Sequence, residues 1–339
     1  MMVKNINKKP LVSIIILNWN GEKCIEQCID SVLSQTYDNF EVIVVDNAST
    51  DKSPEIVKKK YPMVKLIINN KNLGVAKGLN VGIKASKGEL IAILNNDVVL
   101  HKDWLLNCVN EILSSNDIGI VGGITYYYDP KDIIWAAGAR VDLFSGFTWH
   151  ISHGEKNVKI EELNDIDYIP SCAIVIKKEI FDKIGLLDEH YFLYFDETDY
   201  CMCAKKMGCK CKIIPSAIVW HMVSFSWKKE GSFGYYHTYK SGLHFILKHF
   251  PIKYILSSIF IQFFIMSIFE ILIFRYPLSY LKLKLKAILW NIKHLNEIIK
   301  ERRFINKLSN NNGKVRIKEV LKLAKIRISE RKLYDSYKK

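Results

Sequence analysis

The chain of 339 residues lacks the glycine-rich phosphate-binding sequences of the two commonest nucleotide-binding folds. No G-x-G-x-x-G follows the first strand-like run, which disfavours a dinucleotide fold, and no G-x4-G-K-[ST] occurs, which disfavours a P-loop ATPase. The N-terminus, MMVKNINKKP, also lacks an apolar stretch of signal-peptide length, and the following LVSIIIL has the length of a strand. We therefore expect the chain to begin in the cytosol.

The zinc-site spacing C-x2-C is missing as well, although the chain has eight cysteines. Four of them form a C-x-C-x5-C-x-C cluster between Cys201 and Cys211. Either a metal cluster or ordinary buried thiols would explain this group, and the spacing favours buried thiols.

Acidic residues are scarce in one part of the chain only. Residues 275–339 hold 19 Lys and Arg against 5 Asp and Glu, whereas the preceding 274 residues hold 30 of each. The net charge of +14 therefore belongs to the C-terminal tail and says nothing about the ligand of the main domain. A hydrophobic content of 49% is enough for a substantial core.

The first 100 residues alternate between strand-like and helix-like patterns. This alternation predicts βαβ units and a largely parallel sheet, the pattern of an α/β fold. The predicted strands are 12–17, 40–45, 64–68 and 90–94, and the predicted helices are 24–34, 53–60 and 75–85.

Polar side chains follow each of the four predicted strands. In a parallel sheet the ligand binds at the carboxyl ends of the strands, so these side chains predict one shared polar crevice. Turns and helix caps would explain any one group, but they explain Asn95–Asp97 poorly because apolar residues follow at once. The groups are Asn18–Asn20, Asp46–Asn47 with Ser49 and Asp51, Asn70 with Asn72, and Asn95–Asp97.

An acidic side chain at a strand end is a common ligand for Mg²⁺ or Mn²⁺ that also binds a diphosphate. Such a metal neutralises the charge that develops on a leaving group.

Six stretches in order resemble glycosyltransferase family 2, the inverting nucleotide-sugar transferases of GT-A fold, and most of all its rhamnosyltransferase-like branch. They span about residues 11–225. The stretches are VSIIILNWNG, EVIVVDNASTDKS, NKNLGVAKGLNVGI, LIAILNNDVVL, GLLDEHYFLYFDETDYC and PSAIVWH.

The resemblance implies roles for the residues at the strand ends. Asn18 and Asn20 would line the nucleotide pocket together with Asn47, and Asp46 would hydrogen-bond the base. Asn72, Gly74 and Asn80 would lie near the base and ribose. The triplet Asn95–Asn96–Asp97 would correspond to the D-x-D metal motif, with Asn95 and Asn96 facing the donor. Asp97 would then be its one carboxylate on Mg²⁺ or Mn²⁺, and His221 could complete the metal shell.

The segment FDETDYC corresponds to the acidic motif of the family, in which one carboxylate acts as general base. By alignment the base would be Glu197. The order of the two acids is reversed here, so Asp196 remains an alternative, and Asp199 would cap the helix or order the site. The purely structural alternative is that all three acidic residues lie in the first turn of a helix, where the helix dipole favours negative side chains.

The expected function is transfer of a sugar from a nucleoside-diphosphate donor to a hydroxyl acceptor, a glycan or a lipid-linked sugar, with no nucleic acid involved. A non-catalytic nucleotide-sugar binder and a nucleotidyltransferase are the alternatives. Residues 125–170, with Trp135, Gly138, Arg140, Trp149, His150 and His153, would form the acceptor side.

The sequence predicts three parts: a transferase domain at 1–250, an apolar membrane-associated segment at 251–277 and a basic helical tail at 278–339. The 25 residues 252–276 are long enough to span a bilayer at about 1.5 Å per residue. A simple span would put the basic tail outside, against the positive-inside tendency, and would carry Gln262 and Glu270 into lipid. We therefore expect an in-plane or re-entrant segment on the anionic cytoplasmic face, with a buried core helix as the alternative.

Overall fold

The computed structural model describes residues 9–158, 160–273 and 275–308. Its centre is a mixed sheet with the strand order β3-β2-β1-β4-β10-β6-β11-β5, and β7 pairs with β6. The strands of this sheet are β1 (Val12–Asn18), β2 (Phe40–Asp46), β3 (Lys65–Ile68), β4 (Leu90–Asn95), β5 (Val98–Leu100), β6 (Ile118–Tyr127), β7 (Ile134–Ala136), β10 (Ala173–Lys177) and β11 (Lys210–His221). A hairpin of β8 (Ala139–Val141) and β9 (Thr148–His150) lies beside it.

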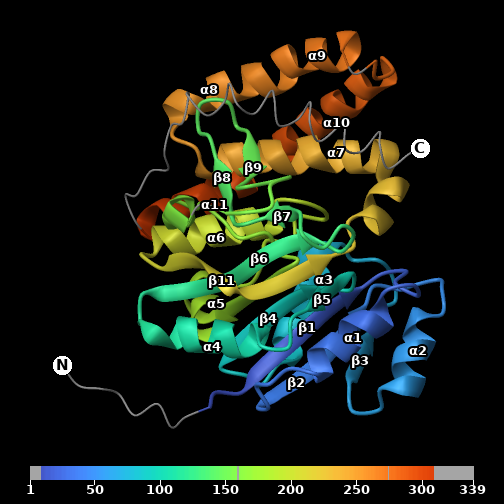
Figure 1. Ribbon diagram of the computed structural model, residues 1–339. Helices are drawn as coiled ribbons and strands as arrows, with labels where there is room; N and C mark the ends of the chain where they lie inside the picture. Colours follow the sequence, from blue (N-terminus) through green and yellow to red (C-terminus); the bar gives the residue numbers. More distant parts are fainter. Residues whose placement is uncertain (1–8, 159, 274, 309–339) are drawn as a thin grey trace.

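Helices cover both faces of the sheet (Figure 1). Side chains of α1 (Ile25–Leu33), α2 (Ser53–Lys60) and α4 (Trp104–Ser114) form one apolar core with the sheet. Those of α3 (Val75–Ala85), α5 (Lys178–Ile184) and α6 (Asp196–Lys206) belong to the core on the other face. The strands β1 and β4 are buried on both faces, which explains their unbroken apolar sequence.

The alternating strands and helices predicted for the first 100 residues are confirmed, with boundaries that differ by one residue or not at all. β1 is parallel to both β2 and β4, with Asn18 opposite Asp46 and Leu17 opposite Asn95. This register brings the polar ends of three strands to one edge of the sheet. A short helix, η1 (Ile160–Asn164), completes the region between β9 and β10.

The C-terminal residues build a separate layer of helices at the top of Figure 1. They are α7 (Ser224–His249), α8 (Ile252–Ile259), the π-helical turn η2 (Phe260–Ile265), α9 (Met266–Leu272), α10 (Ser279–Lys293) and α11 (Leu295–Leu308). The helix α7 packs against α10, α11 and α6, and thereby connects this layer to the sheet domain. The division of the chain at residues 250 and 277 stays a prediction, and the tail from residue 309 lies outside the described residues.

All eight cysteines are free thiols, and those at 24, 28, 108, 172, 201 and 203 are buried. Cys201 and Cys211 are hydrogen-bonded to each other, and burial adds to the raised pKa of Cys201. The preference for ordinary thiols over a four-cysteine metal cluster stays a prediction.

Candidate active site

A chain of side-chain hydrogen bonds connects the ends of three neighbouring strands. Asn96 donates from Nδ2 to Asn18 Oδ1 at 2.7 Å, and Asn18 donates from Nδ2 to Asp46 Oδ1 at 2.7 Å. Asp46 also accepts from the backbone N–H and the hydroxyl of Ser49. Asn18 and Asp46 are fully buried, so their hydrogen bonds hold the strand ends that border the crevice in a fixed arrangement.

The loop after β1 closes tightly over this network. A Cβ at Gly21 would lie 2.3 Å from both Asn18 Oδ1 and Asn96 Nδ2, so only glycine fits there. Asn20 adopts a positive φ of 51°, and its side-chain oxygen accepts from the N–H of Thr50 at 2.8 Å. The neighbouring Trp19 is half exposed.

Asn47, Asn72 and Gly74 lie together next to β2. Asn47 donates to the carbonyl of Gly74 at 2.9 Å, and the N–H of Gly74 donates to Asn72 Oδ1 at 2.8 Å. Gly74 has a φ of 79° and packs so closely on Phe192 that a Cβ would lie 2.6 Å from that ring. The structure therefore brings these three predicted residues into one group.

Asn80 lies apart from this group. Its side-chain amide donates to the carbonyl of Leu187 at 2.8 Å and accepts from the N–H of Leu187 at 3.1 Å. These two bonds hold the segment before α6 against α3. The assignment of Asn80 to the ribose stays a prediction.

Asp97 and His221 lie next to each other just after the end of β4, close enough for both side chains to contact one metal ion. Strand β11 is antiparallel to β5, with His221 opposite Val98, and the Nε2 atom of His221 lies 3.1 Å from Asp97 Oδ1. Both side chains are buried, and the ring of Trp135 packs edge-on against His221 at 4.7 Å. A carboxylate oxygen and an imidazole nitrogen that face each other are a donor set suited to Mn²⁺.

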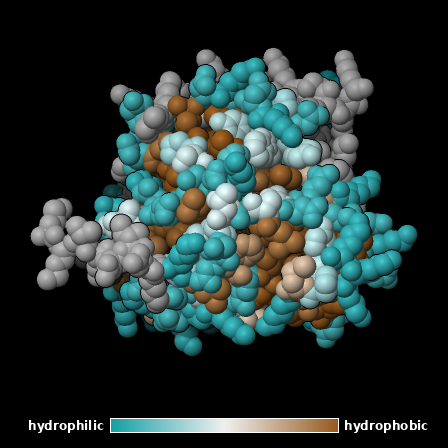
Figure 2. Space-filling model, turned by 60° about the horizontal axis from the view of Figure 1, so that its bottom comes forward, coloured by the Kyte–Doolittle hydropathy of each residue, from teal (hydrophilic) through white to brown (hydrophobic). Residues whose placement is uncertain are grey.

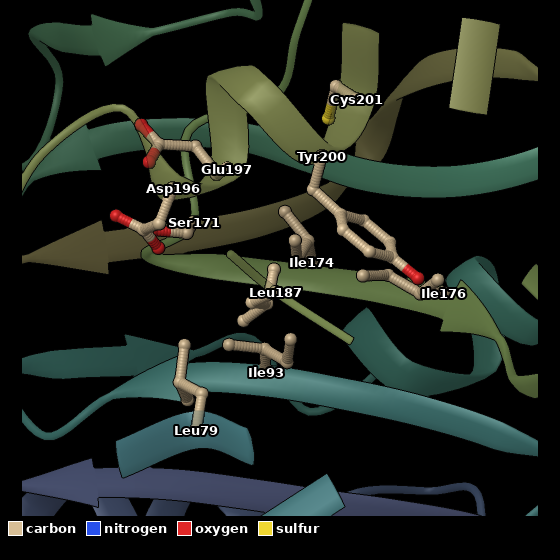
Figure 3. A pocket seen from close by; sticks show the side chains of 10 residues that line it. All are labelled: Leu79, Ile93, Ser171, Ile174, Ile176, Leu187, Asp196, Glu197, Tyr200 and Cys201. Atoms are coloured by element: carbon tan, nitrogen blue, oxygen red, sulfur yellow. The ribbon is translucent and has the colours of Figure 1, made fainter. Parts of the chain in front are cut away.

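The acids at the start of α6 line a small cavity of about 10 Å³ beneath the strand ends. Figure 3 shows Asp196, Glu197 and Ser171 gathered at one end of the cavity, and apolar side chains around the rest. The two residues that precede α6, Tyr194 and Phe195, both have positive φ, an uncommon backbone that tertiary packing must hold in place.

Burial raises the pKa of both acids. The pKa of Asp196 is raised to about 6, and that of Glu197 is raised well above its usual value, first by burial and next by the charge of Asp196. Each carboxyl group affects the pKa of the other, so the two side chains lie close together. Asp196 is buried and Glu197 is partly exposed, so Glu197 is the member of the pair that an incoming molecule can reach.

The Cys172 thiol lies close enough to both Asp97 and Glu197 for their charges to affect its pKa. Burial raises its pKa to about 12, and the charges of Asp97 and Glu197 both add to this shift. The carbonyl of Cys172 also accepts from the N–H of Asn95 at 3.1 Å. Cys172 therefore lies between the end of β4 and the start of α6.

Asp199 points away from the other two acids. It accepts from His249 Nε2 at 2.7 Å and from Tyr191, and its carboxylate lies 3.0 Å from the ammonium of Lys248. Of the two roles predicted for Asp199, these contacts favour ordering of the site, because they attach α6 to α7.

Lys248 is the centre of a buried ion cluster that includes Asp188, Asp199, His244 and Glu301. Several ligand atoms of this cluster lie close enough together to bind a metal ion. The Lys248 ammonium, however, lies 2.7 Å from Asp188 and 3.3 Å from Glu301, and thus already supplies a cation there. We therefore interpret the cluster as ion pairs between α6, α7 and α11.

The predicted acceptor side contributes a group of aromatic and histidine side chains. Trp135 lies between His221 and His150, and His153 bonds to the carbonyl of Trp135 at 2.8 Å. Burial lowers the pKa of His150 to about 3, so this ring is neutral at physiological pH. Arg140 instead donates to the carbonyl of Asp165 and thereby fixes the loop before β10.

Sequence reasoning missed Gly21 and Ser53, although both lie within the quoted motifs. Ser53 accepts from Asn18 at 2.8 Å, and Gly21 is the residue on which the closure of the network depends. A glycine that directly follows a polar strand end was the available signal.

Comparison with known proteins agrees with this geometry. The sequence model described as glycosyl transferase family 2 matches residues 13–185, which is half of the chain. The chain belongs to glycosyl transferase family 2. It is 33% identical over 186 residues to the glycosyltransferase AglE of Haloferax volcanii, a match that covers 53% of this chain and 57% of AglE. It is 31% identical over 200 residues to hyaluronan synthase of Pasteurella multocida, which covers 53% of this chain and 20% of the synthase.

Two solved glycosyltransferase structures show the GT-A fold. A mannosyltransferase of Pyrobaculum calidifontis, in complex with GDP-Man and Mn²⁺, superposes with a TM-score of 0.51 at 17% identity over 89% of this chain and 86% of its own. GalNAc-T7, with UDP, GalNAc and Mn²⁺, gives 0.58 at 14% identity over 86% of this chain and 57% of its own. The fold class predicted from the sequence is thus confirmed.

Proposed function

We propose that this family 2 glycosyltransferase moves a sugar from a nucleoside-diphosphate donor to a hydroxyl group by single displacement, with inversion at the anomeric carbon. The observation that carries this proposal is that the Asp97–His221 pair and Glu197 of the Asp196–Glu197 pair both lie near Cys172. One pair suits a metal and a diphosphate, and the other suits proton removal. A binder without catalysis would need only the first pair.

The strand ends would hold the nucleotide. Asn20, Asn72 and Asn96 are partly exposed and can bond the base and ribose, while the buried Asn18, Asp46 and Asn47 keep them in position. Trp19, half exposed at the end of β1, offers a flat apolar face to the base. The relatives whose structures contain GDP-Man or UDP support a nucleotide-sugar donor.

Asp97 and His221 would hold a divalent cation, with Asn95 beside it. When bound, the metal stabilises the negative charge on the departing diphosphate. An imidazole ligand favours Mn²⁺ over Mg²⁺, because Mg²⁺ prefers oxygen ligands. The mannosyltransferase and GalNAc-T7 structures, both with Mn²⁺, support this choice.

Glu197 would act as the general base. As the acceptor oxygen forms its bond to the anomeric carbon, Glu197 takes the hydroxyl proton, and the bond to the diphosphate oxygen breaks with its electron pair. A carboxylate with a raised pKa is a stronger base than an ordinary one, which suits proton removal from an alcohol. Asp196 raises the pKa of Glu197 through its charge.

The acceptor would be a glycan or a lipid-linked sugar at the cytoplasmic face of a membrane. The apolar helix Ile252–Leu272 and the resemblance to a hyaluronan synthase support membrane association. Nucleotide sugars are made in the cytosol, and the basic tail favours an anionic cytoplasmic surface.

Ligand-induced thermal stabilisation tests the donor and metal assignments. We expect a nucleotide sugar with Mn²⁺ to raise the melting temperature of the full chain by mass action, and Mn²⁺ with Asp97→Asn to lose this shift. Asn95→Ala should lose less, because the Asn95 amide is a neutral and weaker ligand. A shift that is equal in wild type and Asp97→Asn would refute the metal site.

A further inference from the structure

The helix formed by α8, η2 and α9 exposes a row of large apolar side chains along its whole length. In an ordinary α-helix, side chains four residues apart do not lie directly above one another, so a row of them winds slowly around the helix axis. The π-helical turn η2 in the middle of this helix has more residues per turn and reduces this winding. The exposed row consists of Ile252, Leu256, Phe260, Phe264, Ile268 and Leu272. Leu256 and Leu272 are more than 70% exposed, an unusual state for side chains of this kind.

The polar side chains of the same helix face the protein. Ser258 donates to the carbonyl of Leu143 at 2.9 Å, and Gln262 donates to the carbonyl of Ser145 at 3.0 Å. Glu270 accepts from Tyr235 at 2.7 Å and pairs with Lys284 of α10 at 2.7 Å. Gln262 and Glu270, which argue against a membrane span, are therefore fixed to the domain.

Helix α10 lies beside this helix and carries a second apolar row (Figure 1). Lys284 connects the two helices, since it also donates to Ser267 of α9 at 2.8 Å. The exposed residues recur at helical spacing: Leu278, Leu281, Leu285, Leu289 and Ile292. Figure 2 shows the opposite end of the molecule, where hydrophobic residues toward the middle lie among hydrophilic ones.

Basic side chains outnumber acidic ones in the segment that carries the two rows. Residues 251–293 contain one acidic residue, Glu270, which forms a buried ion pair with Lys284. The remaining cations are exposed: Lys253, Arg275, Lys282, Lys286 and Lys293. Apolar rows flanked by cations match the apolar core and anionic headgroups of a bilayer.

We propose that these two rows form one bilayer-facing surface, by which the enzyme lies flat on an anionic membrane without crossing it. The 21 residues Ile252–Leu272 are long enough to span, but a span would pull Gln262 and Glu270 out of their bonds and into lipid. A buried core helix is also excluded, because only 22% of the most apolar part is buried. This proposal names the surface that would produce the membrane association proposed above. Its test involves neither the nucleotide-sugar donor nor sugar transfer.

The test is flotation of the full chain with vesicles, in the absence of detergent and nucleotide. We expect binding to vesicles of phosphatidylcholine with phosphatidylglycerol and weaker binding to phosphatidylcholine alone. The triple variant Leu256→Ser, Phe260→Ser, Phe264→Ser should bind anionic vesicles at least tenfold less, because it removes three large apolar side chains from the surface that would enter lipid. The double variant Lys282→Glu, Lys286→Glu should lose the preference for anionic lipid.

The matched control is Met63→Ser, Ile68→Ser, Leu113→Ser, three equally exposed apolar residues of the sheet domain. This variant should bind like the wild type. Wild-type failure to float, or equal binding by the two triple variants, would overturn the proposal. In spheroplasts, cleavage of a tag after Lys339 by external protease would show a membrane span and would also overturn it.

Discussion

At the scale of single residues, the site depends on side chains that both donate and accept. Asn18 accepts from Asn96 and donates to Asp46, so one amide couples two strand ends. Asp at position 18 would remove the bond to Asp46, and Leu would remove both bonds. Each buried polar partner left without its hydrogen bond costs about 1–3 kcal/mol.

The acid pair leads to a prediction about pH. The base must be unprotonated, so kcat/KM should rise with pH, with an apparent pKa above that of an ordinary carboxylate. The charge of Asp196 raises the pKa of Glu197, and Asp196→Asn removes this charge. The rising limb of the variant should therefore move to lower pH while activity remains. The measurement is the rate of nucleoside-diphosphate release across roughly pH 5–8.

Two outcomes would contradict this division of roles. An inactive Asp196→Asn beside an active Glu197→Gln would make Asp196 the base. A pH profile of Asp196→Asn that coincides with the wild-type profile would mean that the two carboxyl groups do not interact.

At the scale of elements, the acidic helix α6 is attached to the C-terminal layer by a buried ion cluster. Burial alone would raise the pKa values of Asp188 and Asp199, but Lys248 and the neighbouring histidines lower both. The cluster therefore joins the segment that carries Glu197 to α7 and α11.

Lys248→Met should destabilise the protein by about 3–5 kcal/mol, because it leaves two buried carboxylates without their cation. Because both carboxylate pKa values are lowered, the stabilisation is present above about pH 4 and is lost as the pH falls below it. The difference in the free energy of unfolding between Lys248→Met and the wild type should thus become smaller at acidic pH. Denaturant unfolding at several pH values measures this difference.

The control is Lys183→Met, which removes an exposed pair with Glu179 and should change stability by less than about 1 kcal/mol. Equal effects of the two substitutions would mean that the Lys248 cluster does not contribute to stability.

This cluster also marks the limit of what the sequence can predict. The strands and helices up to Asn95 follow from local periodicity, and the polar strand ends follow from the parallel order of the sheet. Asp199 was grouped with its neighbours Asp196 and Glu197, because the sequence does not reveal a partner 49 residues away at Lys248. Likewise, Glu270 and Lys284 each disturb an apolar pattern, and only their pairing across two helices explains both.

At the scale of the whole molecule, the proposed reaction involves three parts of the chain. The sheet would present the nucleotide crevice and α6 would present the base at its edge. The helical layer, which the Lys248 cluster joins to α6, would face the membrane with its outer surface. Ser258 and Gln262 further connect that layer to the loop between β8 and β9, next to the predicted acceptor side. An enzyme arranged in this way can take its donor from solution and its acceptor from the bilayer.

The most direct test of this account is the release of nucleoside diphosphate from a nucleotide sugar, with Mn²⁺ and a membrane extract as acceptor, by wild type and Glu197→Gln. We predict that the extract stimulates release by the wild type and that the variant is slower by at least ~10²-fold, the usual contribution of a general base. Donor binding by the variant, measured by thermal shift, should remain. Release by Glu197→Gln at the wild-type rate would contradict the account.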